Sequence, residues 1–274
     1  MTAGTKVVDE AILEAQALTA GYGANTVLHD VSLLVPEQRL TVLAGPNGSG
    51  KSTFLSLLSR VLKPTRGAVL LDGRAMVALP TRQIARSLGL LPQAPLVPEG
   101  ISVYDLVSRG RYPHQGLLRQ WSDADENAVE KALAATSLAP LAGRTVDSLS
   151  GGQRQRAFIA MTLAQETPVI LLDEPTTFLD LRYQNEVMDL IGSLTHDHGR
   201  TVVAVLHDLN AALQYADRIV FLKAGRIHTV VEDLEACTEA LIGDVFETAV
   251  TRLTHPVTGK PAFLTIPSGK AAAV

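Results

Sequence analysis

Short runs of apolar residues recur along the chain, and turn-forming residues usually follow them. Four of these runs predict strands, at 40–45, 169–173, 201–207 and 218–225. The first three contain few charged residues, which is typical of parallel strands buried on both faces. Helical patterns lie between the runs, notably at 51–62 and 181–194. This alternation predicts an α/β fold with a mainly parallel sheet and helices on both faces.

Two parts of the chain depart from this alternation. Residues 11–19 and 26–36 predict an antiparallel strand pair, joined by the turn GYGAN, and hence an N-terminal antiparallel β subdomain. Between about 94 and 165 we find no convincing strand, so we expect a mostly helical lobe inserted into the α/β core.

The clearest helix of this lobe is predicted at 122–138. It opens with Ser122 and has Asp125 three positions later, which is close to a capping box. Acidic residues in a first turn are typical of a solvated helix N-terminus, and we expect these to be solvated.

Composition narrows the possible classes of protein. A net charge of −4 excludes the basic surface typical of nucleic-acid binding, so we expect no nucleic-acid partner. The single cysteine, Cys237, allows no internal disulfide and fits a reducing compartment. The longest apolar stretch, near 157–164, is too short to span a bilayer, and the first residues lack the apolar region of a signal peptide. We expect a soluble or membrane-peripheral protein.

The sequence GPNGSGKST follows a predicted strand and precedes a predicted helix, which is the context of a phosphate-binding loop. Gly45, Gly48 and Gly50 allow the backbone to curl so that its N–H groups point at phosphate oxygens. Lys51 is expected to reach the β- and γ-phosphates, and Ser52 to offer its hydroxyl to Mg²⁺.

Two carboxylates stand at the end of the run at 169–173, one as its last residue and one directly after it. Asp173 is placed at the carboxyl edge of the sheet to hold Mg²⁺, and Glu174 is the candidate general base or water-orienting group. His207 ends the next predicted strand on the same edge, where it could contact a γ-phosphate.

A second glycine-rich segment, LSGGQRQR at 149–156, begins 98 positions after Lys51. Its SGGQ stands at a predicted helix start, where backbone N–H groups, the Ser150 hydroxyl and the helix dipole favour phosphate.

Together these motifs resemble the ATP-binding-cassette (ABC) ATPases. The resemblance implies catalytic roles for Glu174, His207 and Gln93, and Mg²⁺ binding by Ser52, Gln93 and Asp173. It assigns ATP binding to Tyr22, Gly45, Pro46, Asn47, Gly48, Ser49, Gly50, Lys51, Ser52 and Thr53. It assigns the signature motif to Leu149, Ser150, Gly151, Gly152 and Gln153, and the D-loop to Leu179 and Asp180.

The resemblance also implies an organisation. It predicts one ABC ATPase domain at 11–267 between flexible ends at 1–10 and 268–274. Within that domain it predicts a core at 11–93 and 166–235, a helical subdomain at 94–165 and a short C-terminal extension at 236–267. The segment 255–267 is expected to form a C-terminal strand pair.

In this family two subunits pack head to tail, so each ATP lies between the phosphate loop of one and the signature motif of the other. The resemblance therefore implies a homodimer with ATP and Mg²⁺. The segments 107–118, 174–191 and 207–227 are most similar to ATPases of bacterial importers of ferric siderophores, haem and cobalamin, and among these to the ferric-siderophore group.

This branch implies further partners. Two membrane permease subunits are expected to dock near 93–118, with an extracytoplasmic binding protein acting indirectly, so the protein should lie peripherally on the cytoplasmic face of the cell membrane. A haem or cobalamin importer and a soluble cluster-assembly ATPase remain alternatives.

Overall fold

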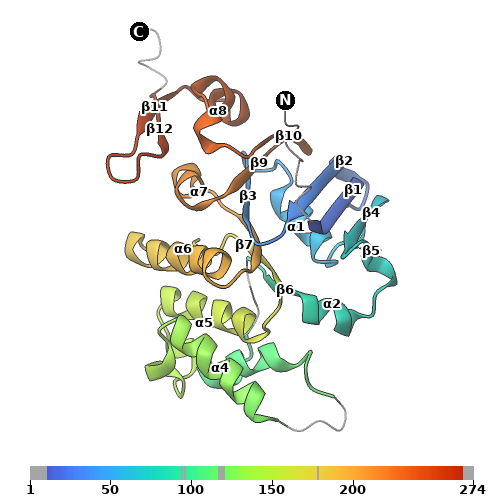
Figure 1. The fold of residues 1–274 in the computed structure, drawn as a ribbon, viewed down its shortest axis with the longest axis vertical. Coiled ribbons are helices and arrows are strands. Elements are labelled where there is room, and N and C mark those ends of the chain that lie inside the picture. Colours follow the sequence, from blue (N-terminus) through green and yellow to red (C-terminus); the bar gives the residue numbers. More distant parts are fainter. Residues whose placement is uncertain (1–10, 94, 96, 117–120, 178, 268–274) are drawn as a thin grey trace, which may run out of the picture.

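The computed structural model describes residues 11–93, 95, 97–116, 121–177 and 179–267. The predicted flexible ends, at 1–10 and 268–274, lie outside these residues. The fold is α/β, as predicted, with a six-stranded sheet, a four-stranded sheet, a two-stranded C-terminal sheet and a helical lobe (Figure 1).

The central sheet has six strands in the order β10-β9-β3-β8-β7-β6. The strands from β9 to β6 are parallel, and β10 pairs with β9 in the antiparallel sense. Every position of β3, β7 and β8 is buried, which explains why these strands read as continuous apolar runs. The strands are β3 (Leu40–Ala44), β6 (Leu88–Leu91), β7 (Val169–Asp173), β8 (Thr201–Val205), β9 (Arg218–Lys223) and β10 (Arg226–Val231).

The side chains of the central strands alternate between two apolar cores. Val42 and Ala44 join one core, which includes residues of the lobe, while the intervening Leu43 joins the other. The first core is covered by α6 (Leu181–His196) and α7 (Leu209–Tyr215), and the second by α1 (Lys51–Leu58) and the N-terminal sheet. Both faces of the sheet are thus covered, and its carboxyl edge is left for ligands.

The N-terminal sheet confirms the predicted antiparallel subdomain and extends it. Its order is β2-β1-β4-β5, and all its pairs are antiparallel. The side chain of Arg218 joins it to the central sheet by donating to the carbonyl oxygen of Leu34 at 2.6 Å. The strands are β1 (Ala11–Tyr22), β2 (Asn25–Pro36), β4 (Arg66–Leu71) and β5 (Arg74–Ala75).

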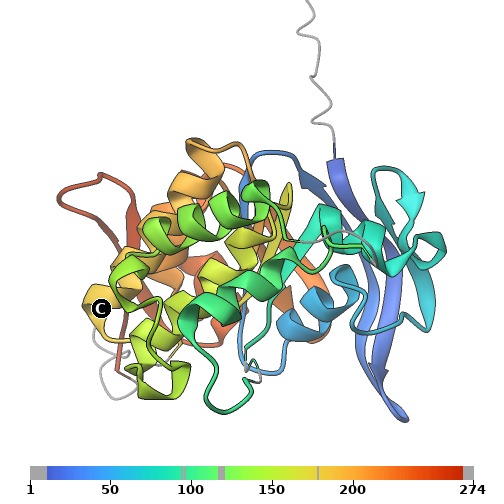
Figure 2. The ribbon, with the colours of Figure 1, turned by 90° about the horizontal axis from the view of Figure 1, so that it is seen from below.

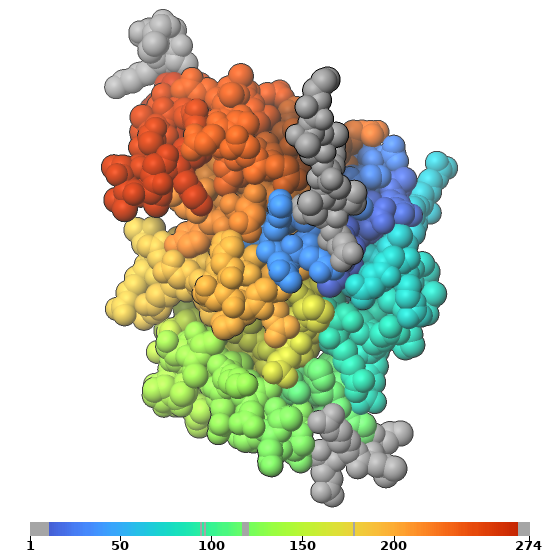
Figure 3. Space-filling view, in the orientation of Figure 1, coloured from blue at the N-terminus to red at the C-terminus, as the bar shows by residue number. Residues whose placement is uncertain are grey.

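The lobe lies at the opposite end of the molecule from the C-terminal strand pair (Figures 1 and 3). Within 94–165 the described residues contain no strand, as expected, and only one isolated bridge. The helices of the lobe lie next to one another when the molecule is seen from below (Figure 2). They are α3 (Val103–Ser108), α4 (Asp123–Ala135) and α5 (Gly151–Ala164).

The helix expected at 122–138 begins where predicted and ends earlier, at Ala135. The capping box is present, because the Ser122 hydroxyl accepts from the Asp125 N–H and the Asp125 carboxylate accepts from the Ser122 N–H.

The expectation that the acidic residues of this turn are solvated is wrong for Asp125. Its side chain is fully buried and accepts from Nε of Arg111 at 3.0 Å. Arg111 is itself buried and donates to the Ala164 carbonyl oxygen and to Glu166. Arg111 lies 14 residues before Asp125, so local sequence gives no sign of the pair.

The Arg111–Asp125 pair makes the stability of the fold depend on pH. Burial alone would raise the pKa of Asp125, but hydrogen bonds from Ser122 and Arg111 outweigh it and hold that pKa below its usual value. A carboxyl with a lowered pKa in the folded state stabilises the fold above its unfolded pKa of about 4. This contribution is lost as the pH falls below that value and through the lower pKa of the folded state.

We expect Arg111→Met to lower the free energy of unfolding by roughly 3 kcal/mol, because it leaves a buried carboxylate without its cation. Urea unfolding at neutral pH measures this. Arg182→Met is the control, since Arg182 is exposed, pairs with Glu186 one turn away and lies 5.9 Å from the centre of the Tyr183 ring, so its loss should change little. An Arg111 variant as stable as the Arg182 variant would contradict the assignment.

The C-terminal extension forms a strand pair, but with bounds different from those expected. The strands are β11 (Val250–Thr254) and β12 (Pro261–Thr265), so most of 255–260 is the turn rather than a strand. The turn is closed by hydrogen bonds between His255 and Lys260 and between Gly259 and His255. The remaining helices are α2 (Thr81–Ser87), α8 (Glu239–Phe246) and single 3₁₀ turns at Met76–Ala78, Arg109–Arg111, Ala139–Leu141, Val146–Ser148 and Leu234–Ala236.

Candidate active site

The phosphate loop leaves β3 and enters α1, and two of its glycines occupy positions that no other residue fits. Gly45 has φ +145°, and a Cβ there would lie 2.1 Å from the carbonyl oxygen of Leu222. Gly50 has φ +100°, and a Cβ there would lie 2.6 Å from Cδ2 of Leu28. The loop is therefore curled tightly against its neighbours, with its N–H groups available at the start of α1.

Lys51 stands at the centre of this loop. Its side chain is buried, and Nζ donates to the carbonyl oxygens of Gly45 and Pro46, each at 2.9 Å. Burial lowers the pKa of Lys51, while the nearby charges of Glu174 and Asp173 act against that shift. A cation held inside a ring of backbone groups is suited to meet phosphate oxygens.

Ser49 adds a polar group that fits the same ligand. Its hydroxyl is buried and has no hydrogen-bond partner among the described residues. A phosphate oxygen in the loop would give it one.

Ser52 and Asp173 meet as the sequence predicts for a metal pair. The Ser52 Oγ donates to Oδ1 of Asp173 at 2.9 Å. Burial raises the pKa of Asp173, and the hydrogen bond from Ser52 opposes that shift. A hydroxyl and a carboxylate are hard oxygen ligands, which fit Mg²⁺.

In the described part of the chain no group of three or more His, Cys, Asp or Glu side chains is placed to hold a metal.

Glu174 is the centre of the candidate hydrolytic group. One carboxylate oxygen, Oε2, accepts from Gln93 Nε2 at 2.7 Å and from Thr177 Oγ1 at 3.0 Å. The other, Oε1, lies 2.5 Å from Nε2 of His207. The structure thus brings together the three residues named as catalytic from the sequence, although 81 positions separate Gln93 from Glu174.

The backbone of Glu174 is strained. Its φ is +52°, in the left-handed region that residues other than glycine rarely occupy. This turn separates the Glu174 side chain from that of Asp173, which meets Ser52 instead. Strained backbone of this kind is common at active sites, where it holds a side chain in a required position.

A hollow of about 180 Å³ joins these groups. It is lined by Val27, Asn47, Gly48, Gly50, Lys51, Ser52, Thr53, Glu174 and His207. Val27, in the lining, and Thr177, which contacts Glu174, are not among the predicted site residues. Thr177 follows Glu174 by three residues, which is the spacing of a β-turn, and its N–H donates to the Glu174 carbonyl oxygen. This spacing is the sequence signal that could have pointed to Thr177.

Several predicted site residues do not line this hollow: Gly45, Pro46, Ser49, Gln93, Asp173, Leu179, Asp180, Tyr22 and the signature residues. Tyr22, at the end of β1, is 58% exposed and stands outside it. The signature residues 149–153 lie at the start of α5, in the lobe, apart from α1 (Figure 1). There Ser150 caps the helix by accepting from the Gln153 N–H, and the Gln153 side chain accepts in return from the Ser150 N–H.

The signature motif instead contacts the D-loop of its own chain. Gly152 is buried, and a Cβ there would lie 3.1 Å from the ring of Tyr183 and 3.6 Å from Leu179. Asp180 caps α6 through the N–H of Tyr183. The start of α5 is thus packed against the start of α6.

The family described as ABC transporter matches residues 28–177. The petrobactin import ATP-binding protein FpuD of Bacillus anthracis is 49% identical over 258 residues, covering 94% of each chain. The ferric enterobactin transport ATP-binding protein FepC of Escherichia coli (strain K12) is 45% identical over 260 residues, covering 95% of each.

Solved structures of ABC transporters also match this chain. A metal-chelate type ABC transporter in an inward-facing conformation matches with a TM-score of 0.81 at 28% identity, covering 94% of this chain and 98% of that one. A bacterial ABC transporter cassette solved as a dimer matches with a TM-score of 0.72 at 30% identity, covering 80% and 97%.

Proposed function

Since this chain belongs to the ABC transporter ATPases and hydrolyses ATP as they do, we propose that it powers import of ferric siderophores through partner membrane subunits. ATP hydrolysis is supported by the contacts of Glu174 with Gln93 and His207. These contacts lie beside Lys51. The import part is supported by the relatives, whose names describe petrobactin import and ferric enterobactin transport.

In the proposed reaction each group acts on one part of the nucleotide. The loop N–H groups and Lys51 hold the phosphates, and Glu174 orients or deprotonates the water that attacks the γ-phosphorus. Gln93 and His207 hold the two carboxylate oxygens of Glu174 in place. Tyr22 is exposed at the end of β1 and free to stack on adenine.

Ser52, Asp173 and Gln93 would hold Mg²⁺, which supplies charge neutralisation to the phosphate oxygens. The Gln93 amide suits this position, since its nitrogen donates to Glu174 and its oxygen is left for the metal.

We further propose that the site is completed by a second copy of the chain. The hollow of about 180 Å³ is smaller than the roughly 300 Å³ at which ligand pockets begin, so one copy leaves a nucleotide largely uncovered. The start of α5 offers N–H groups to phosphate but stands away from its own loop. A two-fold dimer places it over the partner's loop, and a related cassette was solved as a dimer.

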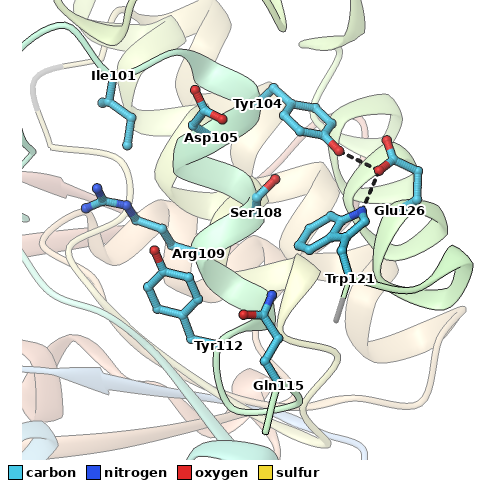
Figure 4. Close-up of a pocket in the computed structure, with 9 residues that line it drawn as sticks. All are labelled: Ile101, Tyr104, Asp105, Ser108, Arg109, Tyr112, Gln115, Trp121 and Glu126. Atoms are coloured by element: carbon cyan, nitrogen blue, oxygen red, sulfur yellow. Dashed lines mark hydrogen bonds between the residues drawn. The ribbon is translucent and has the colours of Figure 1, made fainter. Parts of the chain in front are cut away.

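The docking surface for membrane subunits is proposed on the lobe, near 93–118. Positions 94, 96, 117 and 118 of that range lie outside the described residues, but the rest includes most of a groove of about 700 Å³ (Figure 4). Tyr112 and Trp121 line it and are 61% and 41% exposed, and exposed aromatic side chains are typical of a surface that a partner covers.

A polar network supports the wall of this groove. One carboxylate oxygen of Glu126 accepts from the Tyr104 hydroxyl at 2.5 Å and from Trp121 Nε1 at 2.7 Å (Figure 4). Burial and the bond to Glu126 raise the pKa of Tyr104 to about 12, so the ring stays a neutral donor. The hydrogen bonds to Glu126 thus hold the aromatic side chains of Tyr104 and Trp121 in place at the groove, where a protein segment could dock.

No helix in the described part of the chain has the length and apolarity required to cross a bilayer. Membrane subunits docked in the groove would hold the protein peripherally at the cytoplasmic face of the membrane, with an extracytoplasmic binding protein delivering the substrate to them.

Uptake of labelled substrates tests the proposal. In cells whose own copy is deleted, we expect Lys51→Ala to reduce uptake of ferric siderophores to background and to leave haem and cobalamin uptake unchanged, because Lys51 is needed to bind the phosphates. Lys63→Ala, at an exposed lysine, is the matched control. If only haem or cobalamin uptake is lost, the proposed substrate class is wrong. If no uptake is lost, the result contradicts a role in import.

A further inference from the structure

His207 contacts Glu174 from the short segment that joins β8 to α7. β8 ends at Val205, and α7 begins at Leu209 with Asp208 as its cap. The Asp208 carboxylate accepts from the N–H groups of Asn210 and Ala211, at 2.8 and 3.0 Å. With two residues between the strand and the cap, the position of α7 determines where His207 meets Glu174.

The first turn of α7 is tied to the C-terminal strand pair by the side chain of Asn210. Its Nδ2 donates to the carbonyl oxygen of Phe263 at 3.0 Å, and its Oδ1 accepts from the Phe263 N–H at 2.8 Å. The amide thus pairs with one residue of β12 as a neighbouring strand would. Only a side chain with both a donor and an acceptor can do this.

The partner of Asn210 is a fixed point. The ring of Phe263 is buried in the main core, and β12 pairs with β11 along its whole length. Asn210 therefore connects the segment that contains His207 to Phe263 of β12, 53 residues away in sequence.

A second contact holds α7 one turn later. The Gln214 carbonyl oxygen accepts from Nζ of Lys260 at 2.5 Å, and its Oε1 accepts from the Thr258 hydroxyl at 2.5 Å. Asn210 and Gln214 thus tie two successive turns of α7 to the strand pair and its turn.

A groove of about 870 Å³ lies between α6, α7 and the strand pair. His207 and Thr177, both in contact with Glu174, line it together with His255 and Thr258 from the turn. The strand pair and the hydrolytic group thus border one space, and α7 forms the wall that connects them.

We propose that the β11–β12 pair belongs to the hydrolytic machinery and that Asn210 is a positioning residue for His207. This inference rests on the proposed function, since the role of His207 in hydrolysis is itself proposed. Asn210 does not touch the reacting atoms. It fixes the helix from which His207 reaches Glu174.

Steady-state ATP hydrolysis by the full chain tests this, with Asn210→Ala compared with Asn185→Ala. Asn185 is an exposed amide on α6 that borders the same groove. We expect Asn210→Ala to lower kcat about tenfold with little change in the KM for ATP, since a misplaced group slows the reaction more than it weakens binding. Asn185→Ala should behave as the native chain.

A double variant separates positioning from general stability. In a His207→Ala background, Asn210→Ala should cause no further loss of kcat, because both changes remove the same contact. A native kcat in the single Asn210 variant, or an equal loss with and without His207, overturns the inference. If His207→Ala alone leaves hydrolysis unchanged, the proposed role of His207 fails instead.

Should the alanine variant not fold, Asn210→Asp carries the same comparison. It keeps the acceptor for the Phe263 N–H and sets a carboxylate oxygen against the Phe263 carbonyl.

Discussion

Replacing Glu174 by Gln is expected to lower the rate of ATP hydrolysis at least about a hundredfold and to leave ATP binding intact. A general base contributes about 10²- to 10⁴-fold to a rate, and a neutral amide cannot take the proton. The amide is the same size as the carboxylate, so the contacts with Thr177 and His207 can largely persist. ATP itself is held by the loop and Lys51, which this change does not touch.

Phosphate release measures the rate, and binding of a fluorescent ATP analogue measures the affinity. Glu130→Gln is the matched control, because Glu130 is an exposed carboxylate on α4. A Glu174 variant that hydrolyses ATP within a few fold of the native rate would show that another group activates the water.

Gly151→Asp is expected to abolish hydrolysis, although Gly151 does not line the hollow of its own chain. Gly151 is the first residue of α5 and is exposed. An acidic residue in a first helical turn is favourable, so the helix should tolerate the change. In a dimer the new carboxylate would face the γ-phosphate of the partner's ATP and repel it.

The control for this variant is Gly143→Asp, which adds the same charge to an open position of the same lobe. Thermal unfolding should show both variants to be folded, and only the Gly151 variant should fail to hydrolyse ATP. Full activity in that variant would remove α5 from the site.

Much of the core could be predicted because its strands are buried along their whole length. The runs at β3, β7 and β8 carry little charge, and only a fully covered sheet makes such runs stable. β6 was not predicted from the sequence because it is four residues long and follows α2 with no turn between them. Its place at the sheet edge comes from pairing with β7, whose residues lie 81 positions later.

The buried pair of Arg111 and Asp125 shows another limit of the sequence. An acidic residue in a first helical turn is usually solvated, and only the packing of α5 and the 3₁₀ turn at Arg109–Arg111 against α4 buries this one. Similarly, the phosphate loop and the two carboxylates of β7 are local patterns that spacing reveals. The contacts of Glu174 with Gln93 and His207, and of Asn210 with Phe263, depend on the completed fold.

Mixing two inactive variants tests whether each ATP is hydrolysed between two copies of the chain. One variant carries Lys51→Ala and the other Gly151→Asp, and neither should hydrolyse ATP alone. In a mixed dimer one site pairs an intact loop with an intact signature motif, so hydrolysis should return, at up to about a quarter of the native rate. If mixed dimers form and no hydrolysis returns, the loop and the signature motif of one chain serve the same nucleotide, and the account is wrong.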